Sequence, residues 1–531
     1  MKRGESGPGA SPCFRRKQRD ATATQISRFA PVLTVSHPPS PAPSLETVPL
    51  PLEPGRNCWQ VAKADRAAFI VDAEDYFRIA RKAMLSARSR IMVIGWDVDT
   101  RIRLDHEAKD EAPNSLGPLL SWLVKNRPEL EIHVLAWNAA AYKFLGRGST
   151  IFRLATWARH RRVHFRFDSA HPREASHHQK LLVIDDSLAF CGGIDMTGSR
   201  WDTRGHKDDD PRRRRPTTGR HYGPWHDTIM AVDGEAARAL GELGRLRWKI
   251  GCDEELDEAQ APPAAPWPEG LKADFRDMPV AIARTRGKVM NWTEVREIEA
   301  LYVDMIMAAR RFVYLENQYF ASRVVAQAVE RRLKEKGGPE FLVVSPSSGM
   351  GWLDDEAMSP ARAELMKALG EADHENRFRI YNPLTSNGEQ IYVHSKVMIV
   401  DDRMLRVGSA NLNNRSMGLD SECDVMLDAA TDPSGAAAKT IARIRSDLMA
   451  EHLDVGVEEV EQSFRATGSL IRTVEALRSE GRTLVPFTPE EPSNLEKTLA
   501  HSESLDPESA DDSFEPMAKH RLLRGMRGRL R

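Results

Sequence analysis

The sequence holds little that would fix a compartment or a membrane topology. Its five cysteines are odd in number, lie far apart and include no CxxC pair, which argues against a disulfide framework and against a structural zinc site. No run approaches the roughly 18 apolar residues that a spanning helix needs, and no apolar stretch follows the basic N-terminus as in a secretory signal. The net charge of −1 does not indicate a nucleic-acid binder. We therefore expect any lipid to be met from the surface, and secretion stays open.

With 531 residues, 41% of them hydrophobic and 29% charged, the chain has the composition of a soluble globular protein of two or three domains. Residues 1–54 are rich in Pro, Ser, Thr and Ala without periodicity, and residues 486–531 turn from acidic to basic. We expect both ends to be disordered. Residues 211–216 (PRRRRP) are expected to form a solvent loop. Attraction of these basic segments to anionic lipid is the alternative.

Two series of alternating helices and strands follow one another. Helices are expected at 72–90 and 115–126 and strands at 91–96, 130–137, 162–167 and 179–185; then helices at 294–311 and 323–336 and strands at 312–320, 340–346, 378–383 and 396–402. This alternation predicts an α/β fold with helices on the faces of a sheet. The repeated order indicates an internal duplication, with lobes at 55–265 and 266–485.

One pattern occurs twice. A histidine is followed by a lysine two positions later, an aspartate seven positions later and a glycine fourteen positions later, and the second copy is displaced by 216 positions. The copies are His178, Lys180, Asp185 and Gly192, and then His394, Lys396, Asp401 and Gly408. On a strand, residues i and i+2 point to one face, so each histidine projects together with its lysine.

These residue types suit phosphate chemistry. A lysine is a point charge that fits a phosphate oxygen, and a histidine can act as nucleophile or proton donor near neutral pH. Two such pairs converging on one phosphorus suffice for phosphoryl transfer without an obligatory metal.

HxKxxxxD followed by GG or GS resembles the signature of the phospholipase D superfamily. The segments 177–202 and 393–422 are similar to the two motifs of phosphatidylcholine-type phospholipases D. PWHD (224–227), GWDVD (95–99) and YLENQYF (314–320) resemble further segments of that branch. The likeness covers roughly residues 57–485.

The resemblance implies two phospholipase D-like α/β/α sandwich lobes related by a pseudo-two-fold axis, with the active site in the cleft between them. One histidine attacks phosphorus to form a phosphohistidine, and the other protonates the leaving alcohol. Water or another alcohol then releases the phosphatidyl group. Family precedent makes His178 the nucleophile and His394 the general acid, although the residues alone do not distinguish them.

The resemblance also assigns supporting roles. Lys180, Lys396 and Asn411 are expected to hold the non-bridging phosphate oxygens, with Ser409 beside them. An acidic residue downstream of each motif orients a catalytic imidazole, and we expect Asp227 to serve the first motif and Glu422 the second.

The remaining candidates surround the expected cleft. Gly193 lets backbone amides approach an anion. Asp195 occupies the position of Asn411 and is interpreted as a marker of the branch, because its charge would repel phosphate. The candidate substrate contacts at strand ends, for which loop hydrogen bonding is the alternative, are Glu316, Asn317 and Gln318. Trp96 is a candidate wall of the substrate pocket, for which a position in the buried core is the alternative. Asp185 and Asp401 are expected to fasten the turn behind each strand, and His206 to lie in a polar loop without a role.

We therefore predict a phospholipase D that hydrolyses the distal phosphodiester of a glycerophospholipid at a membrane surface, giving phosphatidic acid, with transphosphatidylation as a side or main reaction. We expect no required cofactor, no metal, no nucleic-acid partner and a monomer. A cardiolipin synthase-like phosphatidyltransferase is the alternative, but such enzymes usually carry N-terminal membrane helices. A superfamily nuclease and a non-catalytic lipid-binding module are weaker alternatives, because the chain lacks a broad basic groove and keeps both His–Lys pairs.

Overall fold

The computed structural model describes residues 48–138, 154, 156–172, 175–260, 262, 266–347, 362 and 365–488, and these belong to one compact unit that begins at Val48. The two ends predicted to be disordered therefore lie outside the described residues, except for 48–54 and 486–488. Leu50 is buried in a hydrophobic cluster, and its amide donates to Asp428. Leu50 thus anchors the segment 48–54 to the fold, although most residues of the segment are exposed.

The elements fall into two lobes. The N-terminal lobe contains β1 (Gln60–Val71), α1 (Ala73–Ser86), β2 (Arg90–Gly95), α2 (Leu116–Asn126), β3 (Glu131–Trp137), β4 (Val163–Asp168), β5 (Leu181–Ile184), β6 (Leu188–Gly192), β7 (Trp225–His226), β8 (Thr228–Asp233) and α5 (Gly234–Cys252). The C-terminal lobe contains β9 (Phe275–Arg286), β10 (Val295–Arg296), α6 (Glu297–Ala308), β11 (Phe312–Glu316), α7 (Arg323–Leu333), β12 (Glu340–Val344), β13 (Phe378–Leu384), β14 (Tyr392–Val393), β15 (Val397–Val400), β16 (Met404–Gly408), α9 (Asn414–Gly418), β17 (Glu422–Asp428), α10 (Ala436–Leu453), α11 (Val457–Thr467), α12 (Leu470–Leu477) and β18 (Thr483–Pro486).

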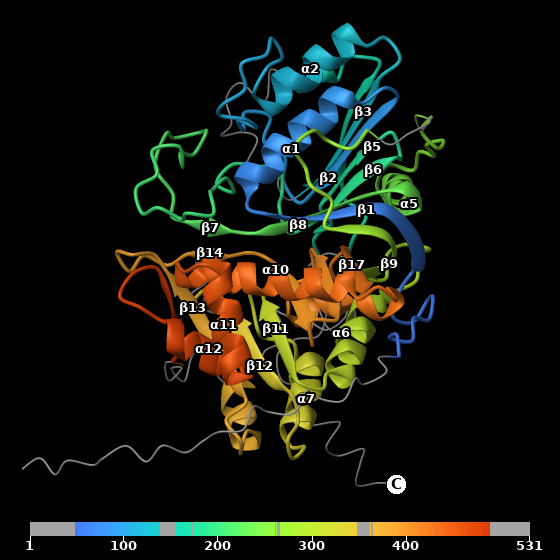
Figure 1. Cartoon of the computed structure of the whole chain (residues 1–531). Helices are drawn as coiled ribbons and strands as arrows, with labels where there is room; N and C mark the ends of the chain where they lie inside the picture. Colours follow the sequence, from blue (N-terminus) through green and yellow to red (C-terminus); the bar gives the residue numbers. More distant parts are fainter. Residues whose placement is uncertain are drawn as a thin grey trace, which may run out of the picture. The chain divides into compact units, whose positions relative to one another are not determined.

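One continuous sheet runs through both lobes (Figure 1). Outwards from β1 its order is β8-β6-β5-β2-β3-β4, and outwards from β9 it is β17-β16-β15-β11-β12-β13, with β18 at the edge. The two orders match strand for strand, and β1 pairs antiparallel with β9 at the centre. The expected α/β fold with two pseudo-symmetric lobes is confirmed, but the lobes share a single sheet.

Helices cover both faces of each lobe (Figure 1). Apolar side chains of α1 and α2 pack on one face of the N-terminal part of the sheet, and those of α6 and α7 on the matching face of the C-terminal part. Helix α5 and helices α10 to α12 contribute to a third core that contains residues of both lobes. Among the described residues, no helix has both the length and the apolar character that crossing a bilayer requires.

The two motif aspartates fasten the sheet in the same way. The Asp185 carboxylate accepts hydrogen bonds from the amides of residues 88–90, just before β2. The Asp401 carboxylate accepts them from the amides of residues 310–312, at the start of β11. Both aspartates have positive φ, 50° and 57°, at the turn after the motif strand. Each therefore ties that turn to the neighbouring strand.

Replacing Asp185 with Ala should lower the free energy of unfolding by about 2–3 kcal/mol, because three amides lose their acceptor. Urea unfolding measures the loss. Asp65→Ala is the matched control, since the Asp65 side chain is 66% exposed, and it should change stability by less than about 0.5 kcal/mol. Equal stability of the two variants would contradict the role given to Asp185.

Candidate active site

Both motif histidines lie at the boundary between the lobes, and the backbone of each is hydrogen-bonded to the other lobe. The amide of His178 donates to the carbonyl of Ser421 at 2.9 Å, and the amide of His394 donates to the carbonyl of His226 at 2.8 Å. Strands β7 and β14 form a short parallel ladder beside the second contact. The two imidazole centroids consequently lie 6.5 Å apart.

Each histidine faces a carboxylate from the opposite lobe. Nδ1 of His178 lies 3.0 Å from both carboxylate oxygens of Glu422, and Nδ1 of His394 lies 2.7 Å from Oδ2 of Asp227. The expectation that each carboxylate serves the motif upstream of it is wrong. The reason is the backbone pairing, because each carboxylate directly follows the residue that accepts from the opposite histidine.

Burial dominates the electrostatics of these pairs. It lowers the pKa of both His178 and His394, with the nearby lysines adding to the effect. Burial also raises the pKa of Glu422 to about 8 and that of Asp227 to about 7. Both directions have one cause, since a net charge on a buried pair is costly. The protons therefore belong to each histidine–carboxylate pair rather than to one member.

The two lysines are equivalent in backbone contact but not in charge compensation. Each Nζ donates to the carbonyl of the histidine two residues earlier. Nζ of Lys180 also lies 3.0 Å from Oδ2 of Asp195, whereas Asn411 occupies the equivalent position in the second copy. Burial lowers the pKa of Lys396 to about 7. Oδ1 of Asn411 is buried without a hydrogen-bond partner. The side chain carries no negative charge to repel an anion, and its NH₂ group is the part that could donate to one.

Ser409 and Gly193 contact the carboxylates of Glu422 and Asp227, respectively. The Ser409 hydroxyl donates to Glu422, and the Gly193 amide donates to the carbonyl of Thr228. A Cβ atom at Gly193 would lie 2.0 Å from Oδ1 of Asp227. The glycine is therefore needed to admit that carboxylate, and its amide is not available to an anion as the sequence suggested.

The predicted substrate contacts in ENQYF are buried and internally bonded. Glu316 is fully buried and accepts hydrogen bonds from Ser395 and Tyr314. Asn317 accepts from the amide of Leu412, and Gln318 donates to the Tyr392 hydroxyl. These hydrogen bonds agree with the alternative of loop hydrogen bonding, and a substrate contact of Glu316, Asn317 or Gln318 stays a prediction.

A cavity of about 580 Å³ adjoins His394. Its aromatic and charged lining residues are Trp96, Tyr222, Trp225, Tyr392, Asp97, Asp99, Glu389, Arg200 and Arg215. The Trp225 ring lies 5.1 Å from the His394 ring, and the Arg200 guanidinium stacks 4.2 Å over Trp225. Trp96 thus lies at a cavity wall as predicted for a pocket residue. Arg200 was missed, because no spacing rule marks it.

Two further expectations hold only in part next to this site, since His206 lies in a loop and 211–216 is exposed except at Arg213. His206, expected in a polar loop, is 1% exposed and lies 2.9 Å from Asp202. The segment 211–216 is not a purely solvated basic loop, because Arg213 is 1% exposed and also donates to Asp202. His206 also contacts Glu451 of the opposite lobe, which a local sequence pattern does not reveal, whereas Arg213 also donates to the nearby carbonyls of Lys207 and Asp208.

The matching family and the two relatives described below are all named as phospholipase D or PLD-like proteins. The family described as "Cardiolipin synthase, PLD-like domain" matches residues 302–446. Phospholipase D A of Dictyostelium discoideum is 24% identical over 435 residues, covering 65% of this chain and 31% of that protein. Phospholipase D gamma 1 of Arabidopsis thaliana is 24% identical over 533 residues, covering 71% of this chain and 62% of that protein. The chain thus spans only part of the length of these relatives.

Among solved structures, the chain is similar to the crystal structure of phosphatidylserine synthase from Haemophilus influenzae Rd KW20. The TM-score is 0.47 at 15% sequence identity, and the match covers 73% of this chain and 89% of that one.

The affinity of the site for sulfate should fall as the pH rises through about 7, because Lys396, whose pKa is lowered to about 7, then loses its charge. A fall approaching tenfold per pH unit is expected where one proton is coupled to binding. Sulfate keeps a constant charge over this range, so calorimetry isolates the protein groups. Lys396→Gln should make the dependence less steep without abolishing it, because Asp227 and Glu422, with pKa values of about 7 and about 8, ionise over the same range. The exposed control Lys334→Gln should keep the full dependence. A flat profile in the wild type would contradict this role.

Proposed function

Because the chain belongs to the phospholipase D superfamily, we propose that it is a phospholipase D, a phosphodiesterase that cleaves the distal phosphodiester of glycerophospholipids to phosphatidic acid. The observation that carries this proposal is the meeting of His178 and His394, 6.5 Å apart between ring centroids, each with a carboxylate of the opposite lobe. Reacting atoms approach to about 3–3.5 Å before attack. A phosphorus atom between the two rings fits that spacing.

In the first step, Nε2 of His178 forms a bond to phosphorus while the bond to the head-group oxygen breaks, and His394 gives its proton to that oxygen. In the second step, water or an alcohol attacks phosphorus, its proton passes to His394, and the N–P bond breaks. Glu422 and Asp227 hold Nδ1 of the two rings, which leaves Nε2 for phosphorus and for the leaving oxygen.

The anionic phosphodiester supplies the charge that the empty site lacks. Its oxygens would meet Lys180, Lys396 and Asn411, and a bound negative charge raises the pKa of nearby cations. Lys396 would then be charged, and one histidine could carry the proton needed for the leaving group. No step in this sequence requires a metal ion or another cofactor at the phosphorus.

The cavity beside His394 favours a cationic head group. Quaternary ammonium groups bind over aromatic faces, and Trp96 and Tyr222 line the cavity near the carboxylates of Asp97 and Glu389. The Trp225 ring is already covered by Arg200 and Tyr392. A choline or ethanolamine phospholipid at a membrane surface is therefore the proposed substrate. The alternative, a cardiolipin synthase-like transferase, would place an uncharged glycerol there. Since both half-sites lie in one chain, a monomer suffices for the reaction.

The purified protein should release choline from phosphatidylcholine vesicles and form phosphatidylethanol when ethanol is present. His178→Asn and His394→Asn should each lower the rate by about 10³-fold or more, because groups that act as a unit fail together. The exposed control His374→Asn should retain full activity. Cardiolipin formation from phosphatidylglycerol without choline release would favour the transferase, and cleavage of single-stranded DNA alone would favour a nuclease.

The roles of the two histidines can be separated with a leaving group that needs no proton. On phosphatidyl-p-nitrophenol, His394→Asn should recover to within about tenfold of the wild type, because a general acid typically contributes about 10²–10⁴-fold. His178→Asn should stay inactive on the same substrate. Release of p-nitrophenolate measures both. The reverse pattern would make His394 the nucleophile while leaving the reaction class intact.

A further inference from the structure

A second cluster of titratable groups lies at the lobe boundary and shares its backbone with the active site. Asp72, His206, His226 and Glu451 are each at most 6% exposed, and one ligand atom from each lies within 4.8 Å of the others. Three of them belong to the N-terminal lobe, and Glu451 lies on α10. The proposed mechanism uses none of the four.

The inner atoms have the spacing of ligands around a small cation. Oε1 of Glu451 lies 2.8 Å from Nδ1 of His226 and 3.1 Å from Nε2 of His206. The Asp72 oxygens lie 3.3 Å from the same His226 nitrogen and 3.5 Å from the same His206 nitrogen. Ligands held tetrahedrally at about 2.0–2.1 Å from zinc are about 3.3–3.4 Å apart. Two imidazoles and two carboxylates thus converge on one point.

The outer atoms of the same side chains are bonded as metal ligands usually are. Nδ1 of His206 lies 2.9 Å from Asp202, and Nε2 of His226 lies 2.8 Å from Glu316. The second ring nitrogen of a metal-binding histidine commonly donates a hydrogen bond to a carboxylate, and this bond fixes the tautomer of the ring.

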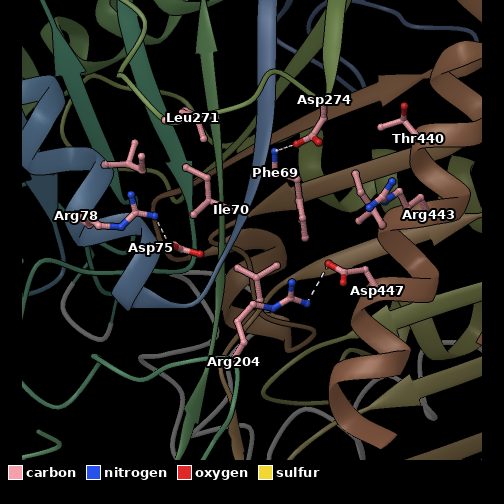
Figure 2. A pocket seen from close by; sticks show the side chains of 14 residues that line it. Phe69, Ile70, Asp75, Arg78, Arg204, Leu271, Asp274, Thr440, Arg443 and Asp447 are labelled. Atoms are coloured by element: carbon pink, nitrogen blue, oxygen red, sulfur yellow. Dashed lines mark hydrogen bonds and ion pairs between the residues drawn. The ribbon is translucent and has the colours of Figure 1, made fainter. Parts of the chain in front are cut away.

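Glu451 is held in the same manner. Its Oε2 accepts from Arg204, which also pairs with Asp447 and lines a cavity of about 220 Å³ between α1 and α10 (Figure 2). Arg204 is 39% exposed, so the outer bonds of the cluster reach a cavity that solvent enters.

One atom in the cluster lacks a partner. Oδ2 of Asp72 is buried and accepts no hydrogen bond, although Asp72 is 1% exposed. An unsatisfied buried carboxylate oxygen is costly. It lies 3.5 Å from Nε2 of His206 without a hydrogen bond, and a cation bound by the four side chains would satisfy it.

We propose that Asp72, His206, His226 and Glu451 bind one divalent transition-metal ion, for which zinc is the best fit to two imidazoles and two carboxylates. The scarcity of paired cysteines argued against zinc, but this ligand set uses none. The ion is held by residues of both lobes. Its four ligands leave no coordination position open for the substrate phosphate. It also fixes Asp227, whose amide donates to Oδ1 of Asp72 at 3.1 Å.

The competing occupant is a pair of protons. Two imidazolium ions would carry the same total charge as one divalent ion, and the surrounding carboxylates do raise the pKa of His206 to about 9. Metal analysis separates the two occupants directly, and it does so whether or not the protein proves to be a phospholipase D.

The full-length protein, purified without a metal-affinity tag, should contain ~1 zinc ion per chain by elemental mass spectrometry. Protein produced with cobalt should show the visible absorption of tetrahedral cobalt. Prolonged dialysis against a strong chelator should lower the melting temperature, and added zinc should restore it. Absence of metal from the native protein, together with no uptake of zinc or cobalt, would overturn the proposal.

Glu451→Gln and His206→Asn should each lose the metal, and the catalytic variants His178→Asn and His394→Asn should keep it. His452→Asn is the matched control, since His452 bonds the neighbouring Glu316 from outside the four ligands. The cobalt spectrum of the folded wild type keeps the test valid if the ligand variants misfold. Loss of metal in the His452 variant with retention in Glu451→Gln would place the ion elsewhere and overturn the assignment.

Discussion

Hydrogen bonds that cross the lobe boundary are the constraint on which this site depends. The segment before each motif strand bonds to the opposite lobe, through Ser421 in one case and His226 in the other. The carboxylate that follows each acceptor is thereby set against a histidine more than 160 residues away. Any shift of one lobe against the other would separate both pairs together, so the proposed chemistry also depends on the central pairing of β1 with β9.

The second constraint is the cost of charge in a buried site. Glu422 and Asp227 are fully buried, and burial raises the pKa of both while it lowers the pKa of the histidines they face. Burial also disfavours a charge on Lys396 and lowers its pKa. Burial of this kind makes a net charge in the site costly. An anionic substrate therefore relieves an electrostatic cost as it binds, which couples recognition to activation.

Much of the fold followed from local signals, since strands, helices and the motif aspartates depend on periodicity and spacing that the chain repeats at a fixed interval. The exchange of Asp227 and Glu422 between lobes could not be predicted, because it depends on which strands pair across the boundary. The hydrogen bonds of Glu316 could not be predicted for a related reason. Glu316 ends a strand at the expected cleft, yet α10 and β7 close over it, and contacts across so many residues leave no periodic trace.

The two lobes match strand for strand, and each supplies a carboxylate that contacts the histidine of the other lobe. This arrangement has the form of an isologous interface between two identical subunits. In such a homodimer every substitution appears twice, so the two halves of the site must remain alike. Covalent fusion removes that restriction. Asp195 and Asn411 occupy matching positions, and only the first neutralises its lysine. A single chain can thus divide labour between two histidines that symmetry would have kept interchangeable.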